Sequence, residues 1–367
     1  MSKKVAIISN EHSWTYNLRK EIISELLDSG YEVTLILPYG EKVELLKEMG
    51  CSFVDVPMFE RRGKNPLKEL RLIREYRKIL KKENPDVVLT YTIKPNLYGG
   101  MVCSKLKIPY IANITGLGTA ADKKGVVSSL AKFLYKAGLK KASCVFAQNR
   151  GNRDYLVNNK ILNPEKVIQI PGSGVNLSRF TVSDYPEGDE CNFIFISRLL
   201  KEKGIEDYIE AAKIVKGKYP NTRFHVCGFC EEEYKEHLES LNMEKYVIYH
   251  GMVDNVDEML KQMNALVHPS YYLEGTSNVC LEACASGRVV ITTDHEGCRE
   301  TVVDGKSGFI VPIKNPEKLA EKIIEFIELP YERKKEMGLA ARKHVEDNFD
   351  RRIIVNEYMK AVKNLGI

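Results

Sequence analysis

The stretch His268–Gly287 combines residue types that could bind an anion beside hydroxyl groups. Ala265–Val267 is a short apolar run that Pro269 stops, as expected at the carboxyl end of a buried strand. Thr276 or Ser277 can then cap a helix. Because the first turn of a helix exposes unpaired backbone N–H groups, it suits a phosphate or a diphosphate.

Two glutamates, Glu274 and Glu282, lie on either side of this predicted anion site. Carboxylates accept hydrogen bonds and repel phosphates, so their natural partners are hydroxyl groups such as those of sugars. Taken alone, two glutamates near a helix start are also typical of a solvated helix end. Together with the N–H donors, they indicate a site for a nucleotide sugar.

A basic loop follows the strand predicted at Phe193–Ser197. Its guanidinium, Arg198, and its ammonium, Lys203, precede Gly204 and could grip a diphosphate. They would also stabilise this group as it leaves, so that no metal ion is needed. The alternatives are that Lys201 takes the role of Lys203, or that the loop is a solvated basic turn.

The two glutamates with their spacing, followed by Ala-x-Ala-x-Gly, closely resemble the signature of retaining GT-B glycosyltransferases of the glycogen synthase/sucrose synthase-like superfamily. The basic loop resembles the Arg-x-x-x-x-Lys-Gly element of that family. The resemblance implies that Arg198, Lys203 and Glu274 carry the chemistry, with no cofactor and no metal ion. It implies donor binding by Ser197, Gly251, Met252, Val253, Gly275, Thr276, Ser277, Asn278, Val279 and Glu282.

The first half of the chain contains candidate residues for binding the acceptor. In the family a glycine-rich loop follows the first strand, but here this loop is Ser9–Trp14 and contains no glycine. The segments Thr90–Asn96 and Asn113–Gly118 follow later strands and resemble the subgroup that builds lipid-linked O-antigen, capsule or glycoprotein glycans. The acceptor and sugar contacts implied are Asn10, His12, Tyr16, Lys94, Asn96, Thr115 and Gly116.

Strands alternate with helices along the whole chain, which predicts an α/β fold. The 367 residues are too many for one ordinary core, and the pattern restarts after Gly172. We therefore predict the GT-B architecture, two Rossmann-like doubly wound parallel-sheet domains that face each other across a cleft. Residues 1–172 would bind the acceptor and residues 173–350 the donor, and a helix at about 351–367 would pack back on the first domain.

The charge is unevenly distributed. Residues 1–172 carry 29 Lys and Arg against 17 Asp and Glu, whereas the remainder carries 26 against 33. Basic residues gather in 61–82 and 123–141, which favours an anionic membrane surface as partner, although the outer face of a core helix can look the same. We expect no nucleic acid partner, because aromatic residues do not interleave with these basic ones.

Other features bear on location. No apolar run is long enough to span a membrane, the N-terminus does not resemble a signal peptide, and an odd number of cysteines suits a reducing compartment. We expect Cys227 and Cys230 to be core or loop thiols, and His268 to be a packed strand-end residue. The expected location is the cytoplasm, peripherally on the inner face of the plasma membrane.

The prediction is a retaining, metal-independent glycosyltransferase. It would move a sugar, most simply a UDP-linked N-acetylhexosamine or hexose, to a polyprenyl-diphosphate-linked saccharide. One alternative is a GT-B-like sugar-nucleotide epimerase, and another is a non-catalytic partner subunit that binds a nucleotide sugar. Mass balance separates them, because only transfer consumes an acceptor and releases nucleotide.

Overall fold

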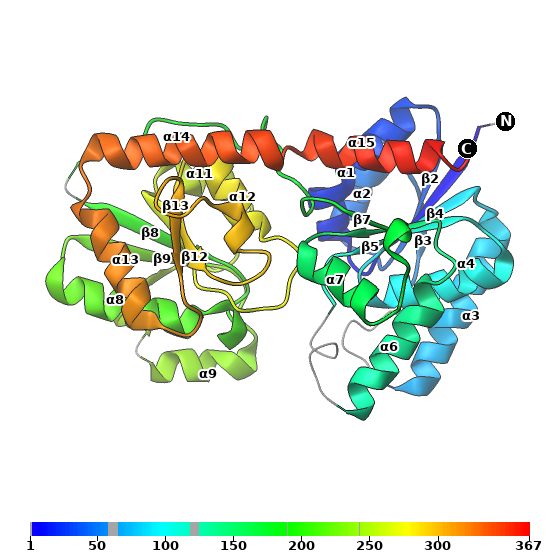
Figure 1. Cartoon of the computed structure of the whole chain (residues 1–367), viewed down its shortest axis with the longest axis horizontal. Helices are drawn as coiled ribbons and strands as arrows, with labels where there is room; N and C mark the ends of the chain where they lie inside the picture. Colours follow the sequence, from blue (N-terminus) through cyan, green and yellow to red (C-terminus); the bar gives the residue numbers. More distant parts are fainter. Residues whose placement is uncertain (1, 58–64, 118–124, 189, 242) are drawn as a thin grey trace. The chain divides into compact units, whose positions relative to one another are not determined.

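The computed structural model describes residues 2–57, 65–117, 125–188, 190–241 and 243–367. The chain forms two compact units (Figure 1). The first comprises Met1–Ser173, Leu273–Gly275 and Arg352–Ile367. The second comprises Gly174–Tyr272 and Thr276–Arg351.

The first unit is built on a seven-stranded parallel sheet with the order β3-β2-β1-β4-β5-β6-β7. Its strands are short apolar runs, as expected for strands buried on both faces. They are β1 (Lys4–Ile8), β2 (Glu32–Leu37), β3 (Ser52–Asp55), β4 (Val87–Tyr91), β5 (Tyr110–Ile114), β6 (Cys144–Ala147) and β7 (Val167–Gln169).

Helices cover both faces of this sheet (Figure 1). One face packs on α1 (His12–Asp28), α2 (Lys42–Glu48) and α15 (Arg351–Lys363). The other face packs on α3 (Pro66–Glu83), α4 (Gly100–Leu106), α6 (Val126–Leu139) and α7 (Arg150–Asn158). The unit also contains two short helices, the π-helix η1 (Pro95–Gly99) and the 3-10 helix η2 (Pro164–Lys166).

The second unit has a six-stranded parallel sheet with the order β10-β9-β8-β11-β12-β13. Its strands are β8 (Cys191–Ile196), β9 (Thr222–Cys227), β10 (Ile248–Tyr249), β11 (Ala265–His268), β12 (Val289–Thr293) and β13 (Gly308–Val311). One core lies between the sheet and α8 (Ile205–Lys218), α9 (Glu232–Ser240), α10 (Met243–Tyr246) and α13 (Pro316–Glu328). The other lies against α11 (Val256–Lys261), α12 (Asn278–Ala285) and α14 (Tyr331–Asn348), and η3 (Lys201–Lys203) and η4 (Arg299–Thr301) are single 3-10 turns.

The predicted two Rossmann-like parallel-sheet domains are confirmed, with local differences. Strands β3 and β7, edge strands of four and three residues, were not predicted from the sequence. The predicted second domain, residues 173–350, includes Leu273–Gly275, whereas these three residues pack with the first unit. Residues Arg352–Ile367 also belong to the first unit.

The strand order reverses at β1 and β4 in the first unit, and at β8 and β11 in the second. Open parallel sheets bind ligands outside the carboxyl ends of strands at such a reversal. Most of the predicted site residues follow these four strands or the next strand, β5. Among the described residues, no helix combines the length and the apolar character needed to cross a bilayer.

Candidate functional site

The two predicted diphosphate-binding cations converge on one aromatic ring in the second unit. The Cζ atom of Arg198 lies 5.6 Å from the ring centroid of Tyr272, and the Nζ atom of Lys203 lies 4.8 Å from it. Lys203 is only 7% exposed. The face of an aromatic ring attracts cations, so Tyr272 holds two like charges together that would otherwise repel each other. Sequence reasoning missed Tyr272, because a tyrosine in a loop carries no signal of this contact.

Close packing between the loops after β8 and β11 holds Arg198 and Lys203 next to Tyr272. A Cβ atom on Gly204 would collide with the carbonyl oxygen of Pro269, so the loop after β8 can approach the loop after β11 only with glycine there. The backbone N–H of Tyr271 donates to the carbonyl of Glu202 at 2.9 Å and joins the same two loops. The rival cation, Lys201, is exposed and pairs with Glu206 at 3.3 Å. The geometry therefore favours Lys203 over Lys201 as the second diphosphate-binding cation.

Helix α12 begins where the anion site was predicted. Its N-cap residue, Ser277, makes no side-chain capping bond, because its hydroxyl lies 3.2 Å from Nε2 of His268. The Ser277 N–H donates to the Gly297 carbonyl at 2.7 Å, so this N–H is not available to a diphosphate, contrary to the prediction. The N–H groups offered to an anion therefore begin at Asn278, whose Oδ1 is buried without a hydrogen-bond partner among the described residues.

Thr276 is buried beside this N-cap, and Val279 packs against the core of the second unit. His268 is 1% exposed, which confirms it as a packed strand-end residue.

Glu282 lies in α12 and is half-buried. Burial raises its pKa to about 7, although Arg351 and Arg179 act in the opposite direction. A carboxyl group with this pKa changes charge near neutral pH. Its ability to accept hydrogen bonds from a hydroxylated ligand therefore depends on pH.

The loop after β10 holds the residues predicted to clasp the nucleobase. Gly251 has a φ of 67°, and its carbonyl accepts a hydrogen bond from the Gly228 N–H at 2.8 Å. Met252 is 71% exposed, whereas Val253 packs against the core. At the end of β8, the Ser197 carbonyl lies so close to Gly228 that a side chain at Gly228 would collide with it. This loop thus offers an exposed, flexible apolar side chain, Met252, next to backbone groups.

Glu274 and Gly275 pack with the first unit. The Asn149 side chain donates to the carbonyls of Glu274 and Gly275 at 3.0 Å and 2.6 Å. A side chain on Gly275 would collide with Gln148, and one on Gly116 would lie 3.2 Å from the Leu273 carbonyl. The structure thus brings Gly116 and Glu274 together, and Asn149 is a positioning residue that sequence reasoning missed.

The loop after β1 is shorter than predicted, because residues 12–14 already belong to a helix. Helix α1 begins at His12, because the Glu11 carboxylate accepts from the N–H groups of Ser13 and Trp14, each at 2.8 Å. The carboxylate therefore occupies the position where an anion would bind to this helix. His12 packs over Gly40, where a Cβ atom would collide with its ring, and Tyr16 lies beneath the Lys20 ammonium at 5.0 Å.

Two residues after β4 are bound within the first unit. Lys94 pairs with Glu69 at 2.6 Å, and both side chains are mostly buried. Asn96 is 1% exposed; it accepts from Thr90 Oγ1 at 2.7 Å and donates to the Asn113 carbonyl at 2.7 Å. The prediction that Asn96 faces an acceptor is therefore wrong, since its amide fixes β4 to β5.

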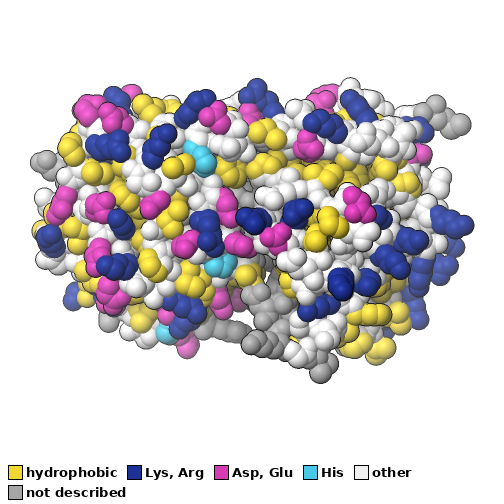
Figure 2. All heavy atoms as spheres, viewed as in Figure 1, with side chains coloured by type: hydrophobic (Ala, Val, Ile, Leu, Met, Phe, Trp, Pro, Cys, Tyr) yellow, Lys and Arg dark blue, Asp and Glu magenta, His cyan; other side chains and the backbone are white. Residues whose placement is uncertain are grey.

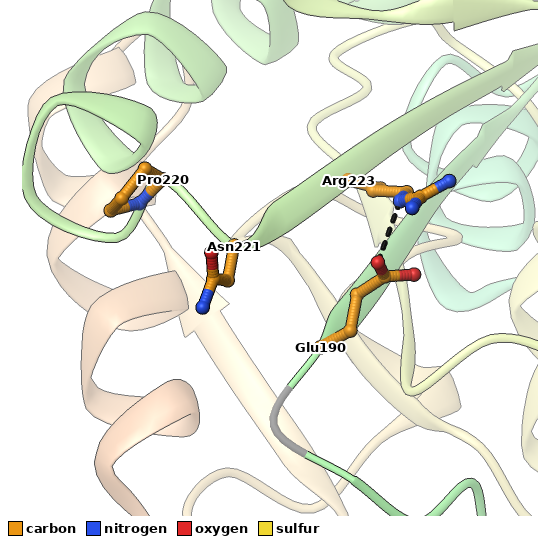
Figure 3. A pocket seen from close by; sticks show the side chains of 4 residues that line it. All are labelled: Glu190, Pro220, Asn221 and Arg223. Carbon is orange, nitrogen blue, oxygen red and sulfur yellow. Dashed lines mark ion pairs between the residues drawn. The ribbon is translucent and has the colours of Figure 1, made fainter.

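A small pocket lies elsewhere in the second unit (Figure 3). Glu190, Pro220, Asn221 and Arg223 line it, and the Arg223 Nε atom pairs with Glu190 at 2.8 Å. These residues lie at or before the first residues of β8 and β9, whereas ligands of such sheets bind at the carboxyl ends. All nine cysteines are free thiols, including the predicted core or loop pair Cys227 and Cys230.

Comparisons with known proteins agree with the fold. Residues 184–344 match the family model described as Glycosyl transferases group 1, and residues 4–149 match the one described as Glycosyl transferase 4-like. Anabaena Alr3699/HepE, solved in complex with UDP and glucose, superposes with a TM-score of 0.80 at 17% identity over 99% of this chain and 100% of that one. The chain belongs to the GT-B glycosyltransferases. The predicted glycosyltransferase family and two-sheet fold are therefore confirmed, whereas retention of the anomeric configuration stays a prediction.

Two curated relatives are also named as glycosyltransferases. One is the N,N'-diacetylbacillosaminyl-diphospho-undecaprenol alpha-1,3-N-acetylgalactosaminyltransferase of Campylobacter jejuni, 29% identical over 97% of each chain. The other is the capsular polysaccharide biosynthesis glycosyltransferase CapM of Staphylococcus aureus, 27% identical over 75% of this chain and 76% of its own.

Proposed function

We propose that this glycosyltransferase transfers a sugar, with retention of the anomeric configuration, from a UDP-sugar to a polyprenyl-diphosphate-linked saccharide. The sugar would be an N-acetylhexosamine or a related hexose. The product would serve the assembly of a surface polysaccharide, capsule, O-antigen or glycoprotein glycan, on the cytoplasmic face of the plasma membrane.

The observation that carries this proposal is the arrangement of Arg198 and Lys203 on the Tyr272 ring. Two cations after β8 and an uncapped helix N-terminus after the neighbouring strand β11 suit a diphosphate, which bears two negative charges. Among the described residues Arg198 has no ion-pair partner, so its charge is available to a ligand. In this proposal the two cations stabilise the departing diphosphate and no metal ion is required.

The mechanism follows from these groups. The acceptor hydroxyl attacks the anomeric carbon on the face from which the diphosphate leaves. The bond from this carbon to the diphosphate oxygen breaks, and that oxygen takes the hydroxyl proton. Arg198, Lys203 and the N–H groups from Asn278 onward stabilise the developing negative charge. Glu274 holds hydroxyls of the donor sugar, and Glu282 holds the hydroxyls of the ribose.

The relatives support the choice of substrates. The name of the Campylobacter jejuni relative describes transfer of N-acetylgalactosamine to a sugar linked to diphospho-undecaprenol. Anabaena Alr3699/HepE was solved with UDP and glucose. We extend both to this chain as a UDP-sugar donor and a lipid-linked diphosphate acceptor.

The first unit is proposed to rest on an anionic bilayer. Helix α6 exposes Val127, Leu130 and Phe133, which recur every three residues and so lie along one side of the helix, and Leu67 and Leu70 of α3 are also exposed. Lys and Arg side chains are dense over the first unit near α3 and α4 (Figure 2). Exposed apolar side chains with surrounding cations fit the interface of a bilayer that carries anionic lipids. Part of the two basic stretches, 61–82 and 123–141, lies outside the described residues, namely Arg61, Arg62, Lys64, Lys123 and Lys124.

The test is nucleotide release from a panel of UDP-, GDP- and ADP-sugars in EDTA, with and without polyprenyl-diphosphate-linked monosaccharides. We expect UDP release only when the lipid acceptor is present, with a product that NMR identifies as having the donor's anomeric configuration. The variants Arg198→Ala and Lys203→Ala should each lower kcat by at least about 100-fold. As a control, Lys201→Ala should keep the rate within about threefold of that of the wild type.

Three outcomes would contradict the proposal. Inverted product would overturn the mechanism, and loss of activity in EDTA that Mg²⁺ restores would overturn metal independence. Tight UDP-sugar binding without any release would identify a binding subunit rather than an enzyme.

A further inference from the structure

Thr92 has a strained backbone at the carboxyl end of β4. Its φ is 71°, in the left-handed region that β-branched residues rarely adopt. Four other described residues besides glycine have a positive φ, namely Asn84, Lys107, Lys160 and Lys314, and none of them is β-branched. Such strain persists only where the surrounding structure imposes it, and it concentrates at functional sites.

The surroundings of Thr92 hold this conformation in place. The Thr92 carbonyl accepts a hydrogen bond from the Asn96 N–H at 3.0 Å. The π-helix η1, which starts at Pro95, follows directly, and π-helices are rare and often found at functional sites. The Asn96 side chain is itself fixed between Thr90 and the Asn113 carbonyl. These contacts therefore hold the backbone of Thr92 in its strained, left-handed conformation.

The strained residue carries a buried polar atom without a partner. Among the described residues, neither Thr92 Oγ1 nor Asn10 Oδ1 has a hydrogen-bond partner, although both atoms are buried. β1 and β4 are neighbours with Ile8 paired to Thr90, so Asn10 and Thr92 each lie two residues beyond this pair. Two unsatisfied oxygens therefore lie past adjacent strand ends, where the strand order reverses.

These atoms define the chemistry of a ligand. A carbonyl oxygen accepts hydrogen bonds, and a hydroxyl group both accepts and donates. The nearby ammonium of Lys94 is already paired with Glu69 at 2.6 Å, so it does not make this an anion site. The complementary ligand is neutral and rich in hydroxyl or amide N–H groups, as a saccharide is.

We propose that Thr92 and Asn10 form a hydroxyl-binding subsite for the saccharide of the acceptor. This inference rests on the proposed function. The ligand satisfies the two buried oxygens, and the strain in Thr92 keeps its hydroxyl directed toward the ligand. Thr92 is then a specificity-determining residue for the acceptor rather than for the donor.

The test compares three variants of Thr92 in acceptor titrations. Thr92→Val keeps the shape but removes the hydroxyl, and we expect it to raise the acceptor KM about tenfold while the donor KM stays within about twofold. Thr92→Ser restores the hydroxyl and should recover most of the acceptor affinity. Thr92→Gly relieves the strain, so it should raise both the acceptor KM and the melting temperature, the latter by about 2 °C or more.

Lys107→Gly is the matched control. Lys107 also has a positive φ, 60°, but it is the C-cap of α4 and precedes β5, so it does not lie at a carboxyl strand end. It should raise the melting temperature without changing the acceptor KM. An unchanged acceptor KM in Thr92→Val would overturn the subsite. So would an increase in the acceptor KM of Lys107→Gly as large as that of Thr92→Gly.

A binding experiment tests the subsite separately from the proposed function. If the wild type transfers no sugar, saturation-transfer NMR with a soluble alkyl-diphosphate-linked N-acetylhexosamine still tests the subsite. Binding to the wild type that is weakened in Thr92→Val supports it without any turnover. Equal signals from both proteins would overturn it.

Discussion

At the scale of single residues, an aromatic ring organises the charge of the donor site. Tyr272 lies within 6 Å of two cations, and each such contact contributes about 0.5–2 kcal/mol, depending on desolvation. We expect Tyr272→Leu to lower kcat/KM for the donor about tenfold, because Arg198 and Lys203 then repel each other without the ring. Steady-state kinetics with varied UDP-sugar would measure this change.

Tyr272→Phe is the control for this prediction, since it retains the ring but not the hydroxyl. It should keep kcat/KM within about threefold of that of the wild type. Equal losses in the Leu and Phe variants would show that the hydroxyl matters and that the ring does not.

Glu282 links donor binding to pH. Burial raises its pKa to about 7, so the carboxyl is mostly neutral at pH 6 and mostly charged at pH 8. A charged carboxylate is the better hydrogen-bond acceptor for hydroxyls. We therefore predict that the donor KM falls as the pH rises through about 7, and that this dependence disappears in Glu282→Gln. Titration of UDP-sugar between pH 5.5 and 8.5 would measure it, and a wild-type KM that is flat over this range would contradict the assignment.

The same group should reduce the stability of the fold. Its pKa in the folded chain lies above the usual value of 4.5, so the folded state binds the proton more tightly. Stability from this group is thus present below about pH 4.5 and is lost as the pH rises through about 7. Glu282→Gln should raise the free energy of unfolding at pH 8 by up to about 3 kcal/mol, yet weaken donor binding. Urea unfolding at pH 8 and at pH 4.5 would test this, because the gain should vanish at the lower pH.

At the scale of elements, one buried arginine connects several segments of the second unit. Arg288 is 0% exposed and donates to the carbonyls of Leu260, Lys261 and Asp184 at 2.9, 2.8 and 3.0 Å. It also donates to Ser183 Oγ at 2.6 Å, and burial lowers its pKa. The guanidinium thus joins the end of α11 to the segment that precedes β8.

Arg288→Met should lower the free energy of unfolding by at least about 3 kcal/mol, because several buried carbonyls lose their donors. Arg333→Met is a matched control, since Arg333 lies in α14 and is exposed; it should cost less than about 1 kcal/mol. Urea unfolding of both variants would compare them. Similar midpoints for the two would contradict the role of Arg288.

Much of the element order follows from local pattern, and some of it does not. Strands such as β5 and β6 are apolar runs that end in polar residues, so periodicity predicts them. The start of α1 was missed because its cap is a glutamate whose carboxylate folds back onto Ser13 and Trp14. Arg198 and Lys203 were predictable from their spacing, whereas Tyr272 and Asn149 act through contacts that only the folded chain creates.

At the scale of the whole molecule, the basic half of the chain carries the surface proposed to meet the membrane. The double variant Leu130→Ser/Phe133→Ser removes two exposed apolar side chains from α6. We expect it to lower binding to vesicles that contain 30% phosphatidylglycerol by at least about tenfold, because each buried side chain contributes about 1.5–3 kcal/mol. Vesicle sedimentation would measure this binding.

Leu339→Ser is the control, because Leu339 is 48% exposed but lies on α14 of the second unit. It should bind vesicles as the wild type does. Wild-type binding that is equal for neutral and anionic vesicles would contradict the role of the basic residues.

The helix α15 has a consequence for how the chain folds during synthesis. Its Tyr358 packs against Tyr91 and Phe146, and its hydroxyl accepts a hydrogen bond from Asn113 at 2.5 Å. The first unit therefore completes its core only after residues 352–367 have been synthesised, whereas the second unit has all its residues by Arg351. Until α15 has been synthesised, Tyr91 of β4 and Phe146 of β6 lack their contacts with Tyr358, so the half of the chain that is translated first is the later one to complete its core.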